Sequence, residues 1–292
     1  MTQHATPEVL EPADPGIAGP DSVTWQIHAD PAMWLAGIRG LYLQALHPRA
    51  VAGVLQNSDF RTNPIGRLLR TADYVGVTTY GSTEEAEAIA ARVRRVHAAL
   101  RGTDPDTGEE FRVDEPELLR WIHCAEVASF LSVVHRSGYP LRRGHADRYF
   151  AEQREAARLV GLDPATVPGS VDEMTRYFSA VRPRLRRSED ADVIYEFLHR
   201  PPVTGLLRLG VGVYEASAGH LAYSLLPSWA IGLYGRRAYP RPITTAALRA
   251  VCRVGRGLPR SPLDGRNGPH VSAAVRRLGR EVSPSPRRLP PL

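Results

Sequence analysis

The chain has 292 residues and a formal net charge of +6, with 37 basic side chains against 31 acidic ones. Every basic residue is arginine, which excludes chemistry that needs a lysine, such as Schiff-base catalysis or phosphate binding by a P-loop. Two cysteines, Cys124 and Cys252, are too few for a disulfide framework or a cysteine-rich metal site, so a reducing, cytoplasmic location is the default.

The chain begins with a segment of low apolar content. Residues 1–21 contain four prolines and lack the basic and then apolar pattern of a signal peptide, so we expect a disordered leader. From 22 to 235 the apolar residues recur at three- and four-residue spacing, without the alternation that strands show. This spacing predicts one all-α, multi-helix domain over residues 22–235.

Several helix boundaries can be predicted from local signals. Pro48 interrupts an apolar helical segment at 31–46, because proline cannot continue the hydrogen-bond ladder. Asn63 before a proline is a start signal, and Ser82 followed by Glu85 is typical of a capping box. The helices expected after these signals are 84–101, 116–137, 145–161, 171–181 and 189–199.

The C-terminal third changes character twice. The apolar stretch 203–232 is interrupted by charged residues, so we expect a buried hairpin of core helices and no transmembrane helix. Residues 236–292 carry 13 arginines against Asp264 and Glu281, or +11, which leaves −5 for residues 1–235. We expect this proline-rich segment to be a largely disordered basic tail that contacts an anionic surface, with peripheral membrane association and no specific nucleic-acid partner.

A histidine lies on the apolar side of the predicted helix 84–101. A buried imidazole needs partners for both ring nitrogens, and binding a metal through one of them meets that need. A hydrogen bond to backbone in an ordinary core meets it as well, so both interpretations stay open. The histidine is His97, and its stripe consists of Ala86, Ile89, Ala90, Val93, Val96 and Leu100.

The next helix repeats this pattern with His123 and Glu126, which lie on its apolar stripe. A His and a Glu three residues apart ligate metal in di-iron bundles, but those proteins need the motif twice, and one copy occurs here. A buried hydrogen bond between the two side chains is the alternative. His47, at the helix break, is suited to capping a helix, bonding a freed carbonyl or approaching a ligand.

Arg67 and Thr71 are four residues apart and share one helical face, with Arg70 one position round. Such arginines either lie in solvent or bind an anion, because a guanidinium stays charged and binds carboxylates through two nitrogens.

Taken in order, these segments resemble the MpaB-type oxygenase family, which includes the latex-clearing proteins, the bacterial rubber oxygenases. The resemblance extends over roughly residues 25–235 and implies an all-α, distantly globin-like fold that encloses one b-type haem, with dioxygen as co-substrate. The matching segments are 43–48 (LQALHP), 67–71 (RLLRT), 80–81 (YG), 92–97 (RVRRVH), Gly102 and 118–123 (LLRWIH).

The resemblance also implies roles for individual residues. His97 stands where the family has the proximal iron ligand, and Arg67, Arg70 and Thr71 stand where it has haem-pocket residues. Arg67 is then a partner for a propionate or an oxygen species. In the rubber-cleaving branch a lysine that reaches the distal iron position replaces Arg70. Because a protonated guanidinium has no lone pair, we expect an open or water-filled distal site here.

Two further sets of residues are candidates by the same resemblance. His47 and His123 are candidates for hydrogen bonding in the distal pocket or behind the iron ligand. The rubber-cleaving enzymes use a distal carboxylate, for which Asp59 is the nearest upstream acid and Glu126 the best buried one. Since neither aligns clearly, rubber cleavage is not the expected reaction.

The sequence therefore predicts a haem b-dependent oxygenase or hydroxylase that acts on an apolar small molecule with an external electron donor. Two alternatives remain: a haem-binding carrier or sensor without turnover, and a haem-free helical interaction protein with a basic tail.

Overall fold

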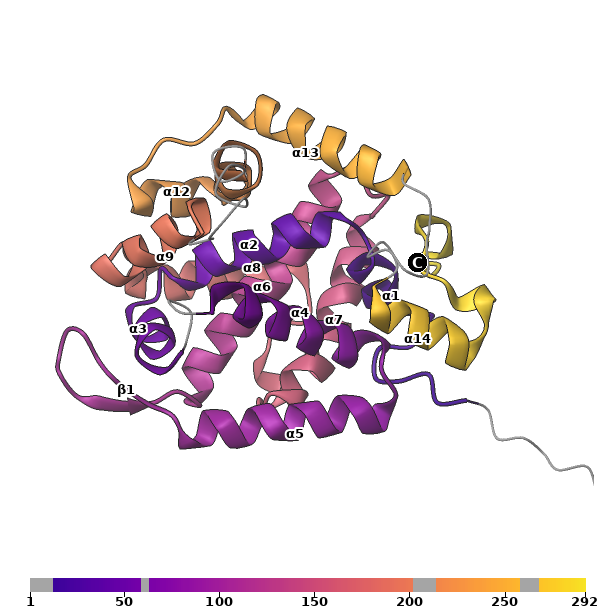
Figure 1. Ribbon diagram of the computed structural model, residues 1–292, viewed down its shortest axis with the longest axis horizontal. Helices are drawn as coiled ribbons and strands as arrows, with labels where there is room; N and C mark the ends of the chain where they lie inside the picture. The colour runs from indigo at the N-terminus through magenta and orange to yellow at the C-terminus, as the bar shows by residue number, and fades with distance from the viewer. Residues whose placement is uncertain (1–12, 59–62, 202–213, 258–267) are drawn as a thin grey trace, which may run out of the picture.

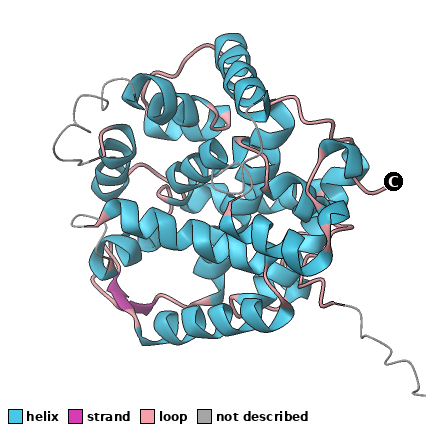
Figure 2. Cartoon of the chain, turned by 45° about the vertical axis from the view of Figure 1, so that its right-hand side comes forward, coloured by secondary structure: helices cyan, strands magenta, loops and turns pink. Residues whose placement is uncertain are grey.

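The computed structural model describes residues 13–58, 63–201, 214–257 and 268–292, and this part of the chain is predominantly helical (Figures 1 and 2). The prediction of an all-α domain is confirmed. The helices are α1 (Val23–His28), α2 (Ala32–Gln44), α3 (Pro48–Asn57), α4 (Pro64–Tyr80), α5 (Thr83–Ala99), α6 (Pro116–Arg136), α7 (Arg143–Leu159), α8 (Val171–Val181), α9 (Glu189–His199), α11 (His220–Ser224), α12 (Ser228–Tyr234), α13 (Arg241–Gly257) and α14 (Pro269–Leu278).

A short hairpin follows α5. Its strands β1 (Arg101–Thr103) and β2 (Glu110–Arg112) are antiparallel and pair Gly102 with Phe111. The helix predicted to run to residue 101 therefore ends two residues earlier, because the chain enters this hairpin.

Capping residues and prolines place most helix ends at the positions predicted from the sequence. The Asn63 side chain accepts a hydrogen bond from the backbone of the first turn of α4. Ser82 and Glu85 form the reciprocal capping box, with Glu85 N–H donating to Ser82 Oγ and Ser82 N–H donating to Glu85 Oε2 at 3.2 and 2.8 Å. Pro48 and Pro116 begin α3 and α6, and α8 and α9 have the predicted bounds.

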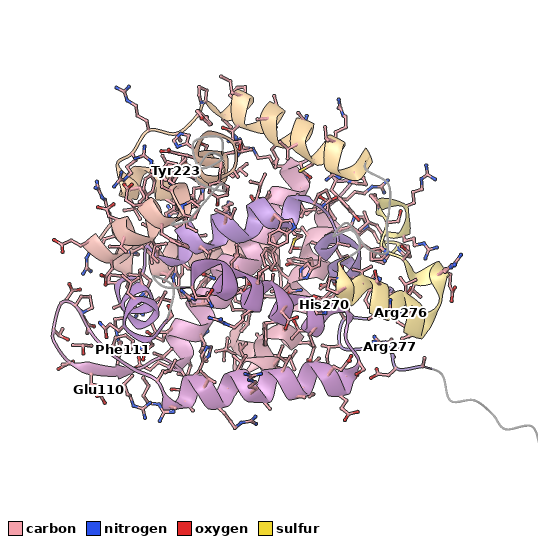
Figure 3. The ribbon with its side chains drawn as sticks, in the orientation of Figure 1. Glu110, Phe111, Tyr223, His270, Arg276 and Arg277 are labelled. Atoms are coloured by element: carbon pink, nitrogen blue, oxygen red, sulfur yellow. The ribbon has the colours of Figure 1, made fainter. Side chains whose placement is uncertain are left out.

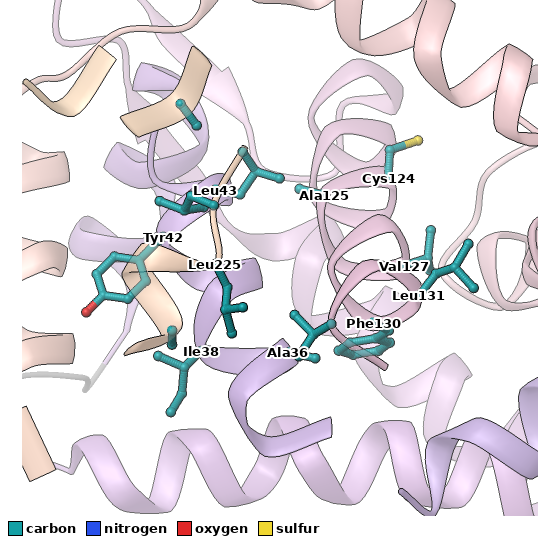
Figure 4. Close-up of a cluster of buried hydrophobic side chains, with 14 of the residues drawn as sticks. Ala36, Ile38, Tyr42, Leu43, Cys124, Ala125, Val127, Phe130, Leu131 and Leu225 are labelled. Atoms are coloured by element: carbon teal, nitrogen blue, oxygen red, sulfur yellow. The ribbon is translucent and has the colours of Figure 1, made fainter. Parts of the chain in front are cut away.

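The hydrophobic core is centred on α2 and α6, which pack against each other in the middle of the molecule (Figure 4). Side chains such as Tyr42 and Leu43 from α2 and Val127 and Leu131 from α6 belong to it. Helix α6 also contacts α1, α3, α7 and α13, so it is covered on several sides. A polar side chain in the middle of α6 must therefore find its partner inside the protein.

A second buried group consists of aromatic residues around Tyr42, one of which, Tyr223, is labelled in Figure 3. Tyr42 Oη lies 2.7 Å from His199 Nδ1, and Tyr234 Oη donates to the Tyr42 carbonyl oxygen at 2.7 Å. Tyr223 Oη donates to the Arg236 carbonyl oxygen at 3.1 Å. These hydroxyl groups are therefore hydrogen-bonded although they are buried.

The C-terminal segment differs from the expected disordered tail after residue 235. Helix α13 buries Leu248 and Cys252 in the same core as α2 and α6. At its end, Arg256 binds Asp30 through Nε and Nη2 at 2.7 and 3.0 Å. The prediction placed this arginine in a disordered tail, whereas it forms an ion pair that ties α13 to the body of the protein.

Helix α14 is also packed. Its residues Val271 and Ala274 form a small hydrophobic cluster with Trp25 and Tyr80. Arg277, labelled in Figure 3, donates to the Tyr80 carbonyl oxygen at 2.9 Å. The folded domain thus extends beyond the predicted boundary and includes the described residues of the predicted tail.

Of the predicted leader 1–21, residues 1–12 lie outside the described residues. The rest contacts the domain, because the Asp14 carboxylate accepts hydrogen bonds from the backbone N–H groups of Gly16 and Thr83 at 2.8 and 2.6 Å. These bonds and the nearby Arg277 guanidinium hold the pKa of Asp14 below its ordinary value.

Part of the apolar stretch 203–232, residues 203–213, also lies outside the described residues. The remainder forms α11 and most of α12, which bury side chains such as Leu221 and Ala230. Among the described helices, none combines the length and apolar character of a membrane span.

We expect Arg256→Ala to lower the free energy of unfolding by about 3–5 kcal/mol, because it leaves Asp30, whose side chain is 3% exposed, as a buried charge without its partner. Arg253→Ala, at an exposed position of the same helix, should change it by less than about 0.5 kcal/mol. Urea unfolding measures both; equal effects would contradict the anchoring role of the ion pair.

Candidate functional site

A cavity of about 240 Å³ lies among α4, α5, α6 and α7, with residues of α1 and the preceding segment also in its wall. Most of the wall is apolar, and the polar side chains enter it from different helices. The apolar side chains include Val75, Leu119, Ile122, Val127, Phe130 and Val160, and the polar ones include His28, Tyr74, His97, His123, Glu126 and Gln153.

Three histidines face this cavity, and they differ in their hydrogen bonding. His28 has a partner for each ring nitrogen, with Nδ1 2.9 Å from Thr79 Oγ1 and Nε2 3.1 Å from Tyr149 Oη. In contrast, His97 Nδ1 and His123 Nε2 are buried and have no hydrogen-bond partner among the described residues. The structure therefore brings together two of the predicted site residues at one cavity and leaves a buried nitrogen of each without a partner.

Burial disfavours the charged form of His97 and His123. It lowers the pKa of His123 to about 4 and holds the pKa of His97 below its ordinary value, against the opposing charge of Asp114. A neutral imidazole carries a lone pair on one ring nitrogen, which is what a metal ligand requires.

The position of His97 follows from the pattern of α5. Its stripe faces the protein at Ala86 and Ala90, which pack on Leu159 of α7 in a small separate cluster. Val96, predicted to belong to the buried stripe, is instead 51% exposed. Helix α5 is therefore held to its neighbours by small side chains at one end and presents His97 to the cavity at the other.

Glu126 brings a carboxyl group into the same cavity. Burial raises its pKa from the ordinary value to about 7. The phenols of Tyr74 and Tyr149 lie close enough for the Glu126 charge to raise their pKa values in addition to the effect of burial. The hydroxyl of Tyr74 is also buried without a partner among the described residues. The predicted hydrogen bond between His123 and Glu126 is not found in this structure.

Arg67, Arg70 and Thr71 lie near the start of α4 and do not belong to the cavity wall. Arg70 and Thr71 are exposed, and Thr71 Oγ1 donates to the Arg67 carbonyl oxygen at 3.2 Å. Arg67 and Thr71 nevertheless share the helical face of Tyr74, which does line the cavity, because residues three, four and seven apart lie on one side of a helix. Their role in a haem pocket stays a prediction.

His47 has a local structural role. It caps α3, with its Nδ1 accepting from the Ala50 N–H at 3.4 Å, and it lies outside the cavity wall. Burial, with the nearby arginine charges, lowers its pKa to about 4. Its predicted catalytic role stays untested, and Asp59, the other candidate acid, lies outside the described residues.

Sequence reasoning missed His28 and Tyr74. Tyr74 follows Thr71 by three residues, so extending the face of Arg67 and Thr71 by one turn would have found it. His28 ends a six-residue helix that was not predicted, although Ser22 accepts from the Trp25 N–H as its N-cap and was a usable signal.

Among the described residues, no group of three or more His, Cys, Asp or Glu side chains is placed to hold a metal ion. Cys124 and Cys252 are buried free thiols, and burial raises the pKa of both, to about 12 and about 11.

Comparison with known proteins identifies the family of this chain. Residues 25–257 match the family model described as ER-bound oxygenase mpaB/B'/Rubber oxygenase, catalytic domain. The match covers most of the chain and includes α13, and the chain therefore belongs to this oxygenase family. No curated protein and no solved structure matches it.

Glu126→Gln should stabilise the protein at high pH. A carboxyl group whose pKa is raised on folding contributes stability below its unfolded pKa and loses it as the pH rises through about 7. Glutamine stays neutral, so we expect a gain in the free energy of unfolding of about 1–3 kcal/mol at pH 8. The gain should shrink towards pH 5 in urea unfolding. Glu155→Gln, which replaces an exposed carboxylate at the same cavity, is the control, and a pH-independent gain at Glu126 would refute its raised pKa.

Proposed function

We propose that this protein is a haem b-dependent oxygenase of an apolar small molecule and that the cavity among α4–α7 is its reaction site. The observation that carries the proposal is the pair of buried nitrogens, His97 Nδ1 and His123 Nε2, which come from two helices and lack partners at one cavity. An unpartnered buried polar atom costs about 1–3 kcal/mol, so two of them at one site favour a ligand that supplies the missing interaction.

The donor set fits a haem. The porphyrin supplies four of the iron ligands, so one neutral histidine suffices to hold the iron on one side. We assign this role to His97, on the resemblance described above and on its neutral, cavity-facing imidazole. His123 then provides a second neutral imidazole as a hydrogen-bonding group in the pocket.

The volume of the cavity sets a condition on this proposal. At about 240 Å³ it is smaller than the roughly 300–1,000 Å³ of ordinary ligand sites, so admitting a porphyrin requires the walls to move apart. Helix α5 is the wall suited to move, because Ala86 and Ala90 bury little apolar surface. It also lies along one edge of the molecule, away from the core of α2 and α6 (Figure 1).

The chain's own residues divide the remaining tasks. The apolar wall, with Ile122, Val127 and Phe130, binds the substrate and excludes water. Glu126, with a pKa of about 7, holds or releases a proton at its carboxyl group near neutral pH. A bound haem b supplies the redox chemistry that activates dioxygen for insertion into the substrate.

Two arginines complete the proposal. Arg67, on the cavity-lining face of α4, binds a haem propionate, together with Thr71 on the same face. Arg70, exposed near the start of α4, would not ligate the iron, because a protonated guanidinium has no lone pair.

The test is the absorption spectrum of the purified protein after titration with hemin. The wild type should bind one haem per chain and show the Soret band of histidine-ligated haem, and His97→Ala should lose or shift that band. His135→Ala, which removes an exposed histidine at the end of α6, is the matched control and should leave the spectrum unchanged.

Two outcomes contradict different parts of the proposal. If the wild type takes up no hemin, the haem-dependent function is wrong. If His123→Ala abolishes the Soret band while His97→Ala keeps it, the site is right and the ligand assignment is wrong. Circular dichroism of each variant separates loss of haem from loss of fold.

A further inference from the structure

The outer face of α13 combines exposed apolar side chains with exposed arginines. Ile243, Val251 and Val254 are 59%, 53% and 66% exposed, although their helix is docked through its opposite side. Together with the exposed Ala250 they form one strip along the helix, since they stand 7, 8 and 11 residues after Ile243. Figure 1 places α13 at the outer edge of the molecule.

Three arginines accompany this strip. Arg241, Arg249 and Arg253 are exposed and border a shallow surface groove on α13, which Thr245 also lines. Helix α13 itself contains no acidic residue, and none of the three arginines forms an ion pair with a described residue. The fourth arginine of the helix, Arg256, binds Asp30. Arg249 Nε donates to the Arg136 carbonyl oxygen at 3.4 Å, which leaves its charge without an anionic partner among the described residues.

We infer that this α13 face, defined by Ile243, Val251 and Val254 with Arg241, Arg249 and Arg253, docks the protein on a bilayer that contains anionic phospholipid. A helix with an apolar strip and an arginine-rich polar face lies in the interface of such a membrane, with its apolar side chains among the acyl chains and its cations at the headgroup phosphates.

The chemistry of the face selects this partner over others. A second copy of the chain would bring two rows of arginines towards each other, which like-charge repulsion disfavours. A nucleic acid offers phosphates but no hydrocarbon for Ile243 and Val254. An anionic bilayer supplies both. The apolar strip then meets the acyl chains, and the arginines meet the headgroup phosphates.

The experiment is cosedimentation of the full chain with vesicles of phosphatidylcholine, with and without phosphatidylserine, at low and high salt. The wild type should bind the phosphatidylserine vesicles, bind phosphatidylcholine weakly, and dissociate at high salt. Arg249→Gln with Arg253→Gln should reduce binding about 25-fold, since each arginine at an anionic surface contributes about fivefold. Val251→Ser with Val254→Ser should reduce it severalfold without changing the net charge.

The matched control is Arg92→Gln with Arg95→Gln. These arginines are exposed on α5, at the opposite edge of the molecule in Figure 1, and their loss changes the net charge by the same amount. Binding should fall less than about twofold, because charges beyond a Debye length of about 10 Å are screened.

Three results would overturn the inference: no binding of the wild type to anionic vesicles, equal losses in the α5 and α13 arginine pairs, or unchanged binding after removal of the two valines. Concentration-dependent dimerisation in sedimentation equilibrium that disappears with the valines would instead identify the face as a contact between copies. Urea unfolding of each variant confirms that these surface changes leave the fold intact. The result does not depend on haem, so it stands or falls separately from the proposed function.

Discussion

The burial of α6 is the constraint on which the rest of the structure depends. Helices α1, α2, α3, α7 and α13 contact it, so most side chains of its middle turns are buried. Apolar residues satisfy this condition by packing, as Figure 4 shows for Val127, Phe130 and Leu131. The polar side chains of His123 and Glu126 cannot be satisfied by packing, and both line the cavity. The cavity is thus the place where a buried helix carries polar groups that packing alone does not satisfy.

The second wall of the site is built differently. Helix α5 joins its neighbours through the small side chains Ala86 and Ala90, and no described residue of it belongs to the main core. Its polar links to α7 include the Glu87–Arg158 ion pair at 2.6 Å and the hydrogen bond from Arg94 Nη1 to the Leu159 carbonyl oxygen at 2.6 Å. Small side chains give little free energy of burial, so displacing this helix disturbs the structure less than displacing α6 would. A rigid wall that carries His123 and an adaptable wall that carries His97 suit a site that admits a large planar ligand.

The fold was predictable where its signals are local. Caps and prolines at Asn63, Ser82, Pro48 and Pro116 fixed helix starts correctly, since each acts within one turn of the chain. The C-terminal segment was not predictable in this way. Its attachment includes the ion pair of Arg256 with Asp30, 226 residues earlier in the chain. Composition cannot distinguish such an arginine from the exposed Arg253. The hairpin after α5 was missed for the related reason that its strands have three residues each, too few for a periodic pattern.

For the site, periodicity predicted that His97 and His123 face inward. It could not show whether their ring nitrogens find hydrogen-bond partners inside the protein. The aromatic group around Tyr42 contains a buried histidine that does have such partners. His199 is buried, as His123 is, yet its Nδ1 meets Tyr42 Oη and its Nε2 meets His220 Nδ1 at 3.2 Å. There the chain even brings the backbone of Gly219 so close that a Cβ would lie 2.8 Å from the Leu198 carbonyl oxygen. Both ring nitrogens of His199 have partners, whereas one buried nitrogen of His97 and one of His123 have none among the described residues. This difference in hydrogen bonding is the physical reason why the proposed reaction site is the cavity and not the aromatic group.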